Sequence, residues 1–431
     1  MHIGGSLSLN WRNVGPKTPG FETQIQNEVY LADMYFGIDG PFIDGVPVQL
    51  EWHIPTGSRG VFELNQLNFK YTRIDGLMLQ FGKFVVPFGR YNELYRPDQF
   101  LTVTRPLTLA SPDSLDLVVR PNSPRPPVSI GYTDIGARVT YYPPTRAVYV
   151  PEELTLFVVN GLGESMGRSR TFPDPQNLGI PAPPTNGVTY DFGHRNNNLA
   201  DDNNNKAFGG RAVYTFGDLP VAWPLPEGAL DLNAVSLGLS SMGGQYDLEN
   251  RMNYMMYAAD YNFEYFGFNF SGEYVYSHNH FLAPMADGAG GIVGDSATAA
   301  VPQTRRFEIH QGYFIQTSFP LLKKPRWGDR VTGILVFNQM FRRGPQLDLL
   351  LNYTDLKGTT FPSLLAYNVN APYTTTRIDK YTGALNWQLT DHFFFKFDYS
   401  YWVMGRATNR SATSIGRVDI YQGALSMALA F

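Results

Sequence analysis

The sequence predicts an all-β protein: a transmembrane antiparallel β-barrel of sixteen strands, with eighteen as the alternative. Three observations predict this fold class. Apolar and polar residues alternate over many short segments, which places one set on each face of a strand. Aromatic residues make up 14% of the chain, as expected for girdles at two membrane interfaces. The last segment, 421–431, alternates up to a terminal Phe431.

The alternating segments follow one another along the whole chain, so we expect one barrel over residues 1–431 with no second domain. They cover 2–10, 26–37, 48–54, 61–73, 76–84, 131–142, 152–160, 207–216, 229–240, 252–264, 266–276, 307–318, 331–341, 347–353, 381–389, 393–403 and 421–431. This odd tally conflicts with the even strand number of bacterial single-chain barrels, so one segment is wrong or one is missed.

The connections between segments show the same conflict. Counted back from a periplasmic C-terminus, the short links Thr390–Asp391 and Arg342–Pro345 fall on the periplasmic side. The long loop 279–306 then falls there too, although long loops are expected at the extracellular end. The 161–206 stretch, rich in Pro, Gly and Asn, is predicted to be a long extracellular loop.

The final segment predicts barrel closure. Tyr421, Leu429 and Phe431 share one face of it, and we assign these three residues to a barrel-assembly signal. The closing strand of an outer-membrane barrel pairs with the first strand and presents large side chains to lipid. An edge or core strand of a soluble β-domain is the alternative that this segment alone leaves open.

Composition excludes several other classes of protein. Mean hydropathy is -0.22, and no run approaches the roughly 18 apolar residues of a membrane helix. The chain has no Cys, so it offers no disulfide framework and no thiolate ligand. A net charge of -4 argues against nucleic-acid binding. No signal peptide is visible at Met1, so the mature form of an exported protein is expected.

Residues 85–130 interrupt the alternation and are the candidate constriction loop of the barrel. Between 83 and 126 there are six basic and four acidic side chains, a local charge of +2. A long loop folded into a large barrel narrows its channel, and arginines at a constriction favour anions. The candidate constriction residues are Arg90, Arg96, Arg105, Arg120, Arg125, Glu93 and Asp98. An extracellular loop with merely solvated charges is the competing interpretation.

Charged residues on the other parity of the strands are predicted to face the lumen. They are Glu51, Arg138, Arg211, Glu273, Lys380, Lys396 and Asp398. Their mixed signs leave the selectivity of the lumen open.

Three motifs resemble one porin family. Gly82–Gly89 (GKFVVPFG), the ending with Tyr381–Leu389 (YTGALNWQL), the turn Thr390–Asp391 and the terminal LSMALAF, and more loosely Gly312–Ser318, are similar to the phosphate-selective porin O and P family. The resemblance implies a 16-stranded, usually trimeric outer-membrane porin, in some members passing phosphate or polyphosphate. This chain departs from the family in lysine supply, with only 9 Lys among its 34 basic residues.

Together these observations predict a porin of the bacterial outer membrane, surrounded by lipid. We expect passive diffusion of small hydrophilic solutes with a preference for anions, in a homotrimer, without cofactor, metal or enzymatic activity. The alternative is a structural barrel that sheathes or anchors a partner, for example a multihaem electron-transfer protein. Such a sheath needs no haem-attaching Cys of its own. An inward-folded loop would favour the porin, and an empty lumen the sheath.

Overall fold

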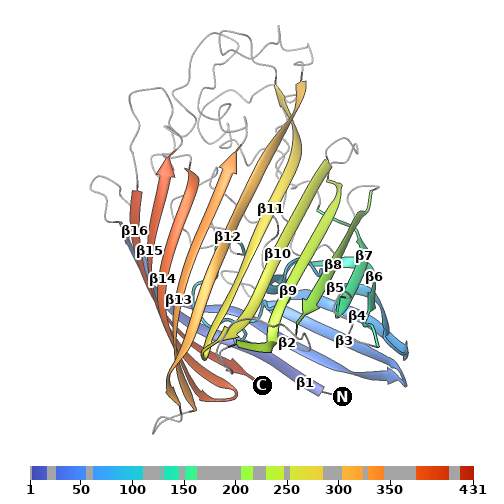
Figure 1. Ribbon diagram of the computed structural model, residues 1–431, viewed down its shortest axis with the longest axis horizontal. Coiled ribbons are helices and arrows are strands. Elements are labelled where there is room, and N and C mark those ends of the chain that lie inside the picture. Colours follow the sequence, from blue (N-terminus) through green and yellow to red (C-terminus); the bar gives the residue numbers. More distant parts are fainter. Residues whose placement is uncertain are drawn as a thin grey trace.

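The computed structural model describes residues 2–16, 26–54, 62–109, 128, 131–144, 151–162, 205–216, 230–246, 253–284, 303–323, 329–343, 375–406 and 418–431. Within them, sixteen antiparallel strands form a closed barrel in which each strand pairs with its neighbours in sequence (Figure 1). The predicted fold class is confirmed. A single helical turn, α1 (Arg90–Glu93), follows the fifth strand. None of the described helices has the length and apolar character needed to cross a membrane.

The strands all run from one rim of the barrel to the other. They are β1 His2–Pro16, β2 Gln26–Ile43, β3 Val46–Ile54, β4 Glu63–Ile74, β5 Leu77–Val85, β6 Thr133–Tyr141, β7 Glu153–Val159, β8 Ala207–Thr215, β9 Leu230–Gln245, β10 Asn253–Tyr265, β11 Phe268–Pro284, β12 Gln303–Lys323, β13 Arg330–Arg343, β14 Thr375–Thr390, β15 Phe393–Arg406 and β16 Val418–Ala430.

Sixteen of the seventeen segments expected from alternation coincide with these strands. The other one, 347–353, lies outside the described residues. The placement of two connections was wrong. Arg343 ends β13 at the rim opposite the Asp391–His392 turn, and Pro284 and Gln303, where β11 ends and β12 begins, pair at that opposite rim too. The error arose because 347–353 was counted as a strand between β13 and β14, which pair directly.

Four two-residue turns of the described residues lie at one rim of the barrel. Asp44–Gly45, Asp75–Gly76, Phe266–Gly267 and Asp391–His392 join strands at the rim where both chain ends lie (Figure 1). Outer-membrane barrels have short turns on the periplasmic side, so this rim is the periplasmic one. Residues 163–204 of the predicted long extracellular loop lie outside the described residues.

The barrel closes between β1 and β16. The pairing runs in continuous register from Ser6 opposite Ala430 to Pro16 opposite Ile420. Phe431 extends it, because its N–H donates to the Gly5 carbonyl at 3.0 Å and its own carbonyl accepts from the Gly5 N–H at 2.8 Å. Closure leaves no unpaired strand edge, which a membrane-spanning sheet requires.

The outer face carries the apolar half of each strand. Leu335 is 59% exposed, Leu239 57% and Tyr399 51%, and these are positions that contact lipid in a membrane barrel. Neighbouring rings form a row across five strands, with centroid distances of 5.9 Å between Tyr313 and Phe337, 5.0 Å between Phe337 and Tyr381, 6.2 Å between Tyr381 and Tyr401, and 5.0 Å between Tyr401 and Tyr421.

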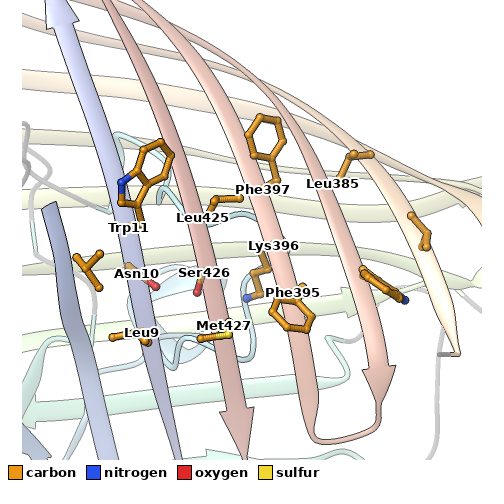
Figure 2. Close-up of a pocket in the computed structure, with 13 residues that line it drawn as sticks. Leu9, Asn10, Trp11, Leu385, Phe395, Lys396, Phe397, Leu425, Ser426 and Met427 are labelled. Carbon is orange, nitrogen blue, oxygen red and sulfur yellow. The ribbon is translucent and has the colours of Figure 1, made fainter. Parts of the chain in front are cut away.

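A shallow apolar groove of about 530 Å³ lies over β1, β2 and β13–β16. Figure 2 shows side chains of Trp11, Leu425 and Phe397 on three adjacent strands of it. The inner face of the same strands carries small and polar residues such as Ser8, Ala428 and Ser426, all buried. Alternation in the sequence thus produces an apolar exterior and a polar interior.

Candidate functional site

The candidate site is built by residues 86–109, here called the inward segment, which leave β5 and fold into the barrel. Its first part binds the wall formed by β9 and β11. The Gly89 N–H donates to Ser240 Oγ at 3.1 Å, and the Tyr91 N–H donates to Glu273 Oε2 at 3.2 Å. Arg90 Nη1 donates to Ser236 Oγ at 3.1 Å.

The same segment also reaches the opposite wall, formed by β2, β3 and β4. Tyr95 donates its hydroxyl proton to Glu51 Oε1, and Arg96 forms an ion pair with Glu51 Oε2. Arg105 Nη2 lies 2.6 Å from Asp33 Oδ2. Since these contacts join distant strands of a closed barrel through their inner faces, the inward segment crosses the barrel interior.

Two lysines hold the backbone of the inward segment on β14 and β15. Lys380 Nζ donates to the Arg105 carbonyl at 3.0 Å. Lys396 Nζ donates to the Pro97 carbonyl at 2.6 Å and also to that of Phe100. Buried carbonyls outside a helix or sheet need such donors, and hydrogen bonds to a charged group contribute about 1.5–3 kcal/mol each. The two lysines therefore fix this part of the chain.

Asp398 of β15 provides the complementary acceptor. Its Oδ2 accepts the Thr104 N–H at 2.6 Å and the Thr104 hydroxyl proton at 2.9 Å. On β13, Asn338 Oδ1 accepts the Leu107 N–H at 3.2 Å. Charged and amide side chains of the wall thus replace the ladder partners that the irregular segment lacks.

An apolar cluster adds a second kind of attachment. Tyr91, Phe100 and Leu109 of the inward segment are buried against Phe314, Ile334, Val336 and Ala384 of β12–β14. The Tyr91 ring meets the Phe314 ring edge-to-face at 4.8 Å between centroids. Burial of this apolar surface stabilises the inward position of the segment.

Asn92 ties the two ends of the loop together. Its side chain is fully buried. Nδ2 donates to the Val86 carbonyl at 2.7 Å, while Oδ1 accepts the Tyr132 N–H at 2.9 Å. Val86 follows β5 and Tyr132 precedes β6, so the amide holds the departing and returning chain at the wall.

Gly89 is required where the segment turns inward. Its φ is +74°, and a Cβ there would lie 2.6 Å from Glu273 Oε2. A residue with a Cβ is strained in this left-handed backbone region, and at this position the Cβ would also collide with Glu273. The glycine permits the hydrogen bonds of residues 89–91 to β9 and β11.

The charges of the segment divide into paired and open groups. Arg96 and Arg105 are neutralised by Glu51 and Asp33. Coulombic attraction to Asp33 contributes to raising the pKa of Arg105 against the opposing effect of burial. Burial raises the pKa of the Tyr95 hydroxyl, and the Glu51 carboxylate raises it further.

Glu93 is a partly buried acid of the segment. Its side chain is 38% exposed and its Oε1 lies 3.7 Å from Arg138 Nη1 on β6. Burial of the carboxylate against the wall raises its pKa above the usual value, opposed by Arg211 and Arg138. Arg90 has no carboxylate within ion-pair distance among the described residues. Among the described residues Arg90 is therefore the unpaired arginine of the segment, and Glu93 forms a partly exposed pair with Arg138 of β6.

The predicted site residues fall into three groups in the structure. Arg90, Glu93, Arg96, Asp98 and Arg105 lie on the inward segment. Arg120 and Arg125 lie outside the described residues. The seven positions predicted to face the lumen are on the inner face, and all but Arg138 are at most 4% exposed. Their role in a constriction stays a prediction.

Sequence reasoning missed Asp33, Asn92 and Asn338. Asp33 lies within an irregularity in the pairing of β1 with β2, between Leu31 and Met34, so simple alternation assigns its face wrongly. Asn92 and Asn338 are uncharged, and a search for charged groups passes over them. The available signal was an asparagine in the non-alternating segment, or on the polar parity of a strand.

Comparison with known proteins identifies the fold but no family. No protein-family model matches the chain, and no curated protein matches it. The resemblance to phosphate-selective porins therefore stays a prediction.

Solved structures match over the whole chain. The outer membrane channel DcaP of Acinetobacter baumannii has a TM-score of 0.51 at 9% identity, over 100% of this chain and 96% of that chain. Pseudomonas putida OprB has a TM-score of 0.51 at 10% identity, over 100% and 94%. Salmonella typhi OmpF has a TM-score of 0.50 at 8% identity, over 100% and 97%.

These similarities define the class to which the fold belongs. A closed sixteen-stranded barrel with an apolar exterior, a polar interior and an inward-folded loop is the outer-membrane porin fold. Its place is the bacterial outer membrane. At these identities the likeness concerns the fold alone.

Proposed function

We propose that this protein is an outer-membrane porin through which small hydrophilic solutes diffuse passively. The observation that carries the proposal is the inward segment, which crosses the barrel interior and is anchored to both walls. A loop held in this way narrows an aqueous lumen to a defined cross-section. The proposed passage runs beside Arg90, Glu93 and Arg138, whose side chains remain partly exposed.

A preference for anions is the finer part of the proposal. Along the proposed passage Arg90 has no carboxylate partner among the described residues, Glu93 and Arg138 form a partly exposed pair, and burial favours the neutral form of that glutamate. A positive field in a channel with low-dielectric walls raises the local concentration of anions. Arg96 and Arg105 contribute less to this field because Glu51 and Asp33 neutralise them.

The sheathing alternative is less compatible with this interior. A partner protein threaded through the barrel would need the space that residues 86–109 occupy. The segment is attached through buried lysines, a buried aspartate and an apolar cluster, so displacing it would expose many unsatisfied groups.

We also propose that the protein assembles as a homotrimer, as the resemblance to phosphate-selective porins implies. The test is the mass of the protein folded in detergent, measured by light scattering. A mass three times that of the 48.4 kDa chain would support the trimer, and a mass of one chain would contradict it.

The decisive experiment for the function is conductance in a planar lipid bilayer. We expect stepwise current increases in KCl. Under a salt gradient, we expect a reversal potential shifted toward the equilibrium potential of chloride. Absence of conductance from protein shown to be folded would contradict the porin proposal. A reversal potential shifted toward the equilibrium potential of potassium would contradict only the anion preference.

The matched variant for selectivity is Arg90→Gln, because Arg90 has no carboxylate partner among the described residues. We expect it to reduce the anion preference while leaving the protein folded. Arg73→Gln is the control, since Arg73 lies at the periplasmic turn, half exposed, beside Asp44. Equal reversal potentials for the two variants would show that Arg90 does not face the passage.

A further inference from the structure

Two carboxylates stand side by side on the inner wall where the inward segment begins. Asp260 of β10 lies directly opposite Glu273 of β11 in the strand pairing, and the two residues are 4% and 2% exposed. Side chains in directly opposite positions are about 5 Å apart at Cβ. Like charges at this distance repel, and the repulsion is strong where little water separates them. We call Asp260 and Glu273 the acid pair.

The nearest cation is bound to one member of the acid pair. Arg211 of β8 donates to both oxygens of Asp260, at 2.6 Å from Nη1 to Oδ2 and 3.0 Å from Nη2 to Oδ1. Among the described residues, Glu273 has no Lys, Arg or His nitrogen within 4 Å. Asp260 is therefore neutralised by an ion pair, whereas Glu273 is not.

Glu273 is compensated instead by the backbone of the inward segment. Its Oε2 accepts the Tyr91 N–H at 3.2 Å, and the Arg90 N–H also donates to this carboxylate. A Cβ on Gly89 would lie 2.6 Å from the same oxygen, so the backbone approaches the carboxylate closely. Hydrogen bonds to a charged acceptor are about twice as strong as those to a neutral one. The attachment of residues 89–91 to β11 therefore depends on the charge of Glu273.

The acid pair contains the titratable group that this attachment needs. On β12 the residue opposite Glu273 is Phe314, and on β9 Ser240 accepts the Gly89 N–H. Arginine and tyrosine keep their charge between pH 8 and pH 4, so the acids are the groups that titrate there. The titratable and charged side chains around Glu273 are Asp260 of β10, Arg211 of β8, and Arg90, Tyr91 and Glu93 of the inward segment.

Release of residues 89–91 would move them in one direction. They lie against the inner faces of β9 and β11, so the space open to them is on the lumen side. Arg90 and Glu93 of the same turn border the proposed passage. The later part of the segment stays attached to β14 and β15. A first turn that leaves the wall would therefore obstruct the passage.

We propose that the acid pair makes the position of residues 89–91, and with it the opening of the channel, depend on pH. With Glu273 ionised, its hydrogen bonds keep this turn on the wall. A proton taken up from solvent by Glu273 removes the repulsion from Asp260 and weakens those hydrogen bonds, so the turn leaves the wall and the channel closes. The inference rests on the proposed porin function and names its regulation.

The first measurement is closure of single channels in a planar bilayer between pH 8 and pH 4. We expect the wild-type ratio of closed to open time to be on the order of tenfold higher at pH 4, which corresponds to about 1.4 kcal/mol. Glu273→Gln keeps the shape but not the charge, so it should show this high ratio already at pH 8. Asp75→Asn, at an exposed periplasmic turn, is the control and should behave as wild type.

Asp260→Asn distinguishes this role from a merely structural one. The substitution removes the repulsion and frees Arg211 to pair with Glu273, so closure should require a lower pH than in wild type. A structural role would make the two substitutions act in the same direction. Closure of Asp260→Asn at higher pH, or a wild-type pH dependence in Glu273→Gln, would overturn the inference.

A readout that does not need conductance separates the inference from the porin function. The chain has no Cys, so spin labels attach only at Arg90→Cys and Asp75→Cys, and the first of these keeps the backbone N–H that Glu273 accepts. Pulsed EPR in detergent should show one distance at pH 8 and a second population at pH 4. Adding Glu273→Gln should produce the second population at pH 8.

The two proposals fail in different ways. A protein that shows this movement but conducts at no pH would support the role of the acid pair and contradict the porin function. Channels that conduct, with a single distance and no closure at any pH, would overturn the role of the acid pair and leave the porin function standing.

Discussion

At some positions of the inward segment, contacts with the barrel wall or the loop ends permit only certain residue types. Gly89 is the clearest case, because its backbone conformation and the proximity of Glu273 Oε2 both exclude a side chain. Asn92 is the second, since its amide pairs with backbone groups at both ends of the loop. At both positions the requirement comes from geometry, and neither residue carries charge.

Gly89→Ala should destabilise the protein more than Gly267→Ala. Gly267 has φ +76° but open space around its Cβ position, so alanine there costs only the left-handed conformation, about 1–2 kcal/mol. Gly89→Ala adds the collision with Glu273 and disturbs the Tyr91 hydrogen bond. Urea unfolding of both variants in detergent measures the difference. Equal losses would show that the Glu273 contact is unimportant.

Glu93 should make the selectivity depend on pH. Because burial raises its pKa, acidification from neutral pH neutralises this carboxylate earlier than an ordinary glutamate. The charged groups that act on it are Arg138 of β6, Glu153 of β7, Arg211 of β8 and Asp260 of β10. Loss of its charge leaves the arginines uncompensated, so anion preference should increase as pH falls.

Reversal potentials measured between pH 7 and pH 4 check this expectation. Glu93→Gln should show the acidic selectivity at pH 7 and a smaller further change. Glu153→Gln is the control and should keep the pH-dependent change. A wild-type reversal potential that does not vary over this range would contradict the assignment.

At the scale of elements, the inward segment behaves as part of the wall. Arg96, Tyr95, Asn65 and Gln66 all bond to Glu51, which is fully buried. Removing one partner of a buried pair leaves a charge without compensation, whereas removing both is often nearly neutral. The Arg96–Glu51 pair therefore positions the segment more than it shapes the field.

Arg96→Gln should destabilise the protein by about 3 kcal/mol, the lower end for a broken buried pair, because other donors still reach Glu51. The double variant Glu51→Gln, Arg96→Gln should recover most of that loss. Denaturant unfolding of wild type, both single variants and the double variant measures the coupling. Additive losses would show that the pair contributes no specific stabilisation. Arg73→Gln, an exposed arginine, should change stability by less than about 1 kcal/mol.

The strands could be predicted from the sequence because each has one apolar and one polar face, and alternation reports that directly. Sixteen expected segments match strands for this reason. The path of residues 86–109 could not be predicted, since a non-alternating segment shows no period. Its anchors Lys380, Lys396 and Asp398 were expected on the inner face, but their partners are backbone groups, which no sequence pattern identifies.

At the scale of the whole molecule, charged residues have two different roles. Some form ion pairs within the barrel wall or hold the inward segment, and others line the proposed solute passage. Most of the buried ionic groups, such as Arg211 with Asp260 at 2.6 Å, are compensated within the wall. Among the described residues of the lumen few charges are unpaired, so the net charge of -4 says little about selectivity. The proposed preference depends on a small number of arginines near Glu93.

Phe431 should affect assembly of the barrel more than its conductance. Its ring lies where a Cβ on Gly5 would come within 2.8 Å of it, so the aromatic side chain covers the glycine at the closing strand pair. Phe431→Ala should slow the appearance of the folded, heat-modifiable form on a gel. Phe42→Ala, which removes an equally large exposed ring at the same rim, is the control. Equal folding rates would contradict an assembly role.

The pairing of Ser6 with Ala430 has a consequence for folding kinetics. The first strand to emerge during synthesis finds its second neighbour only when the last strand exists, so both edges of every shorter intermediate remain open. Such edges template aggregation, and contacts of this sequence separation slow folding. The topology alone therefore implies that the unfolded chain depends on chaperones for some time before it inserts into the membrane. A chain truncated before β16 should aggregate instead of forming a smaller barrel.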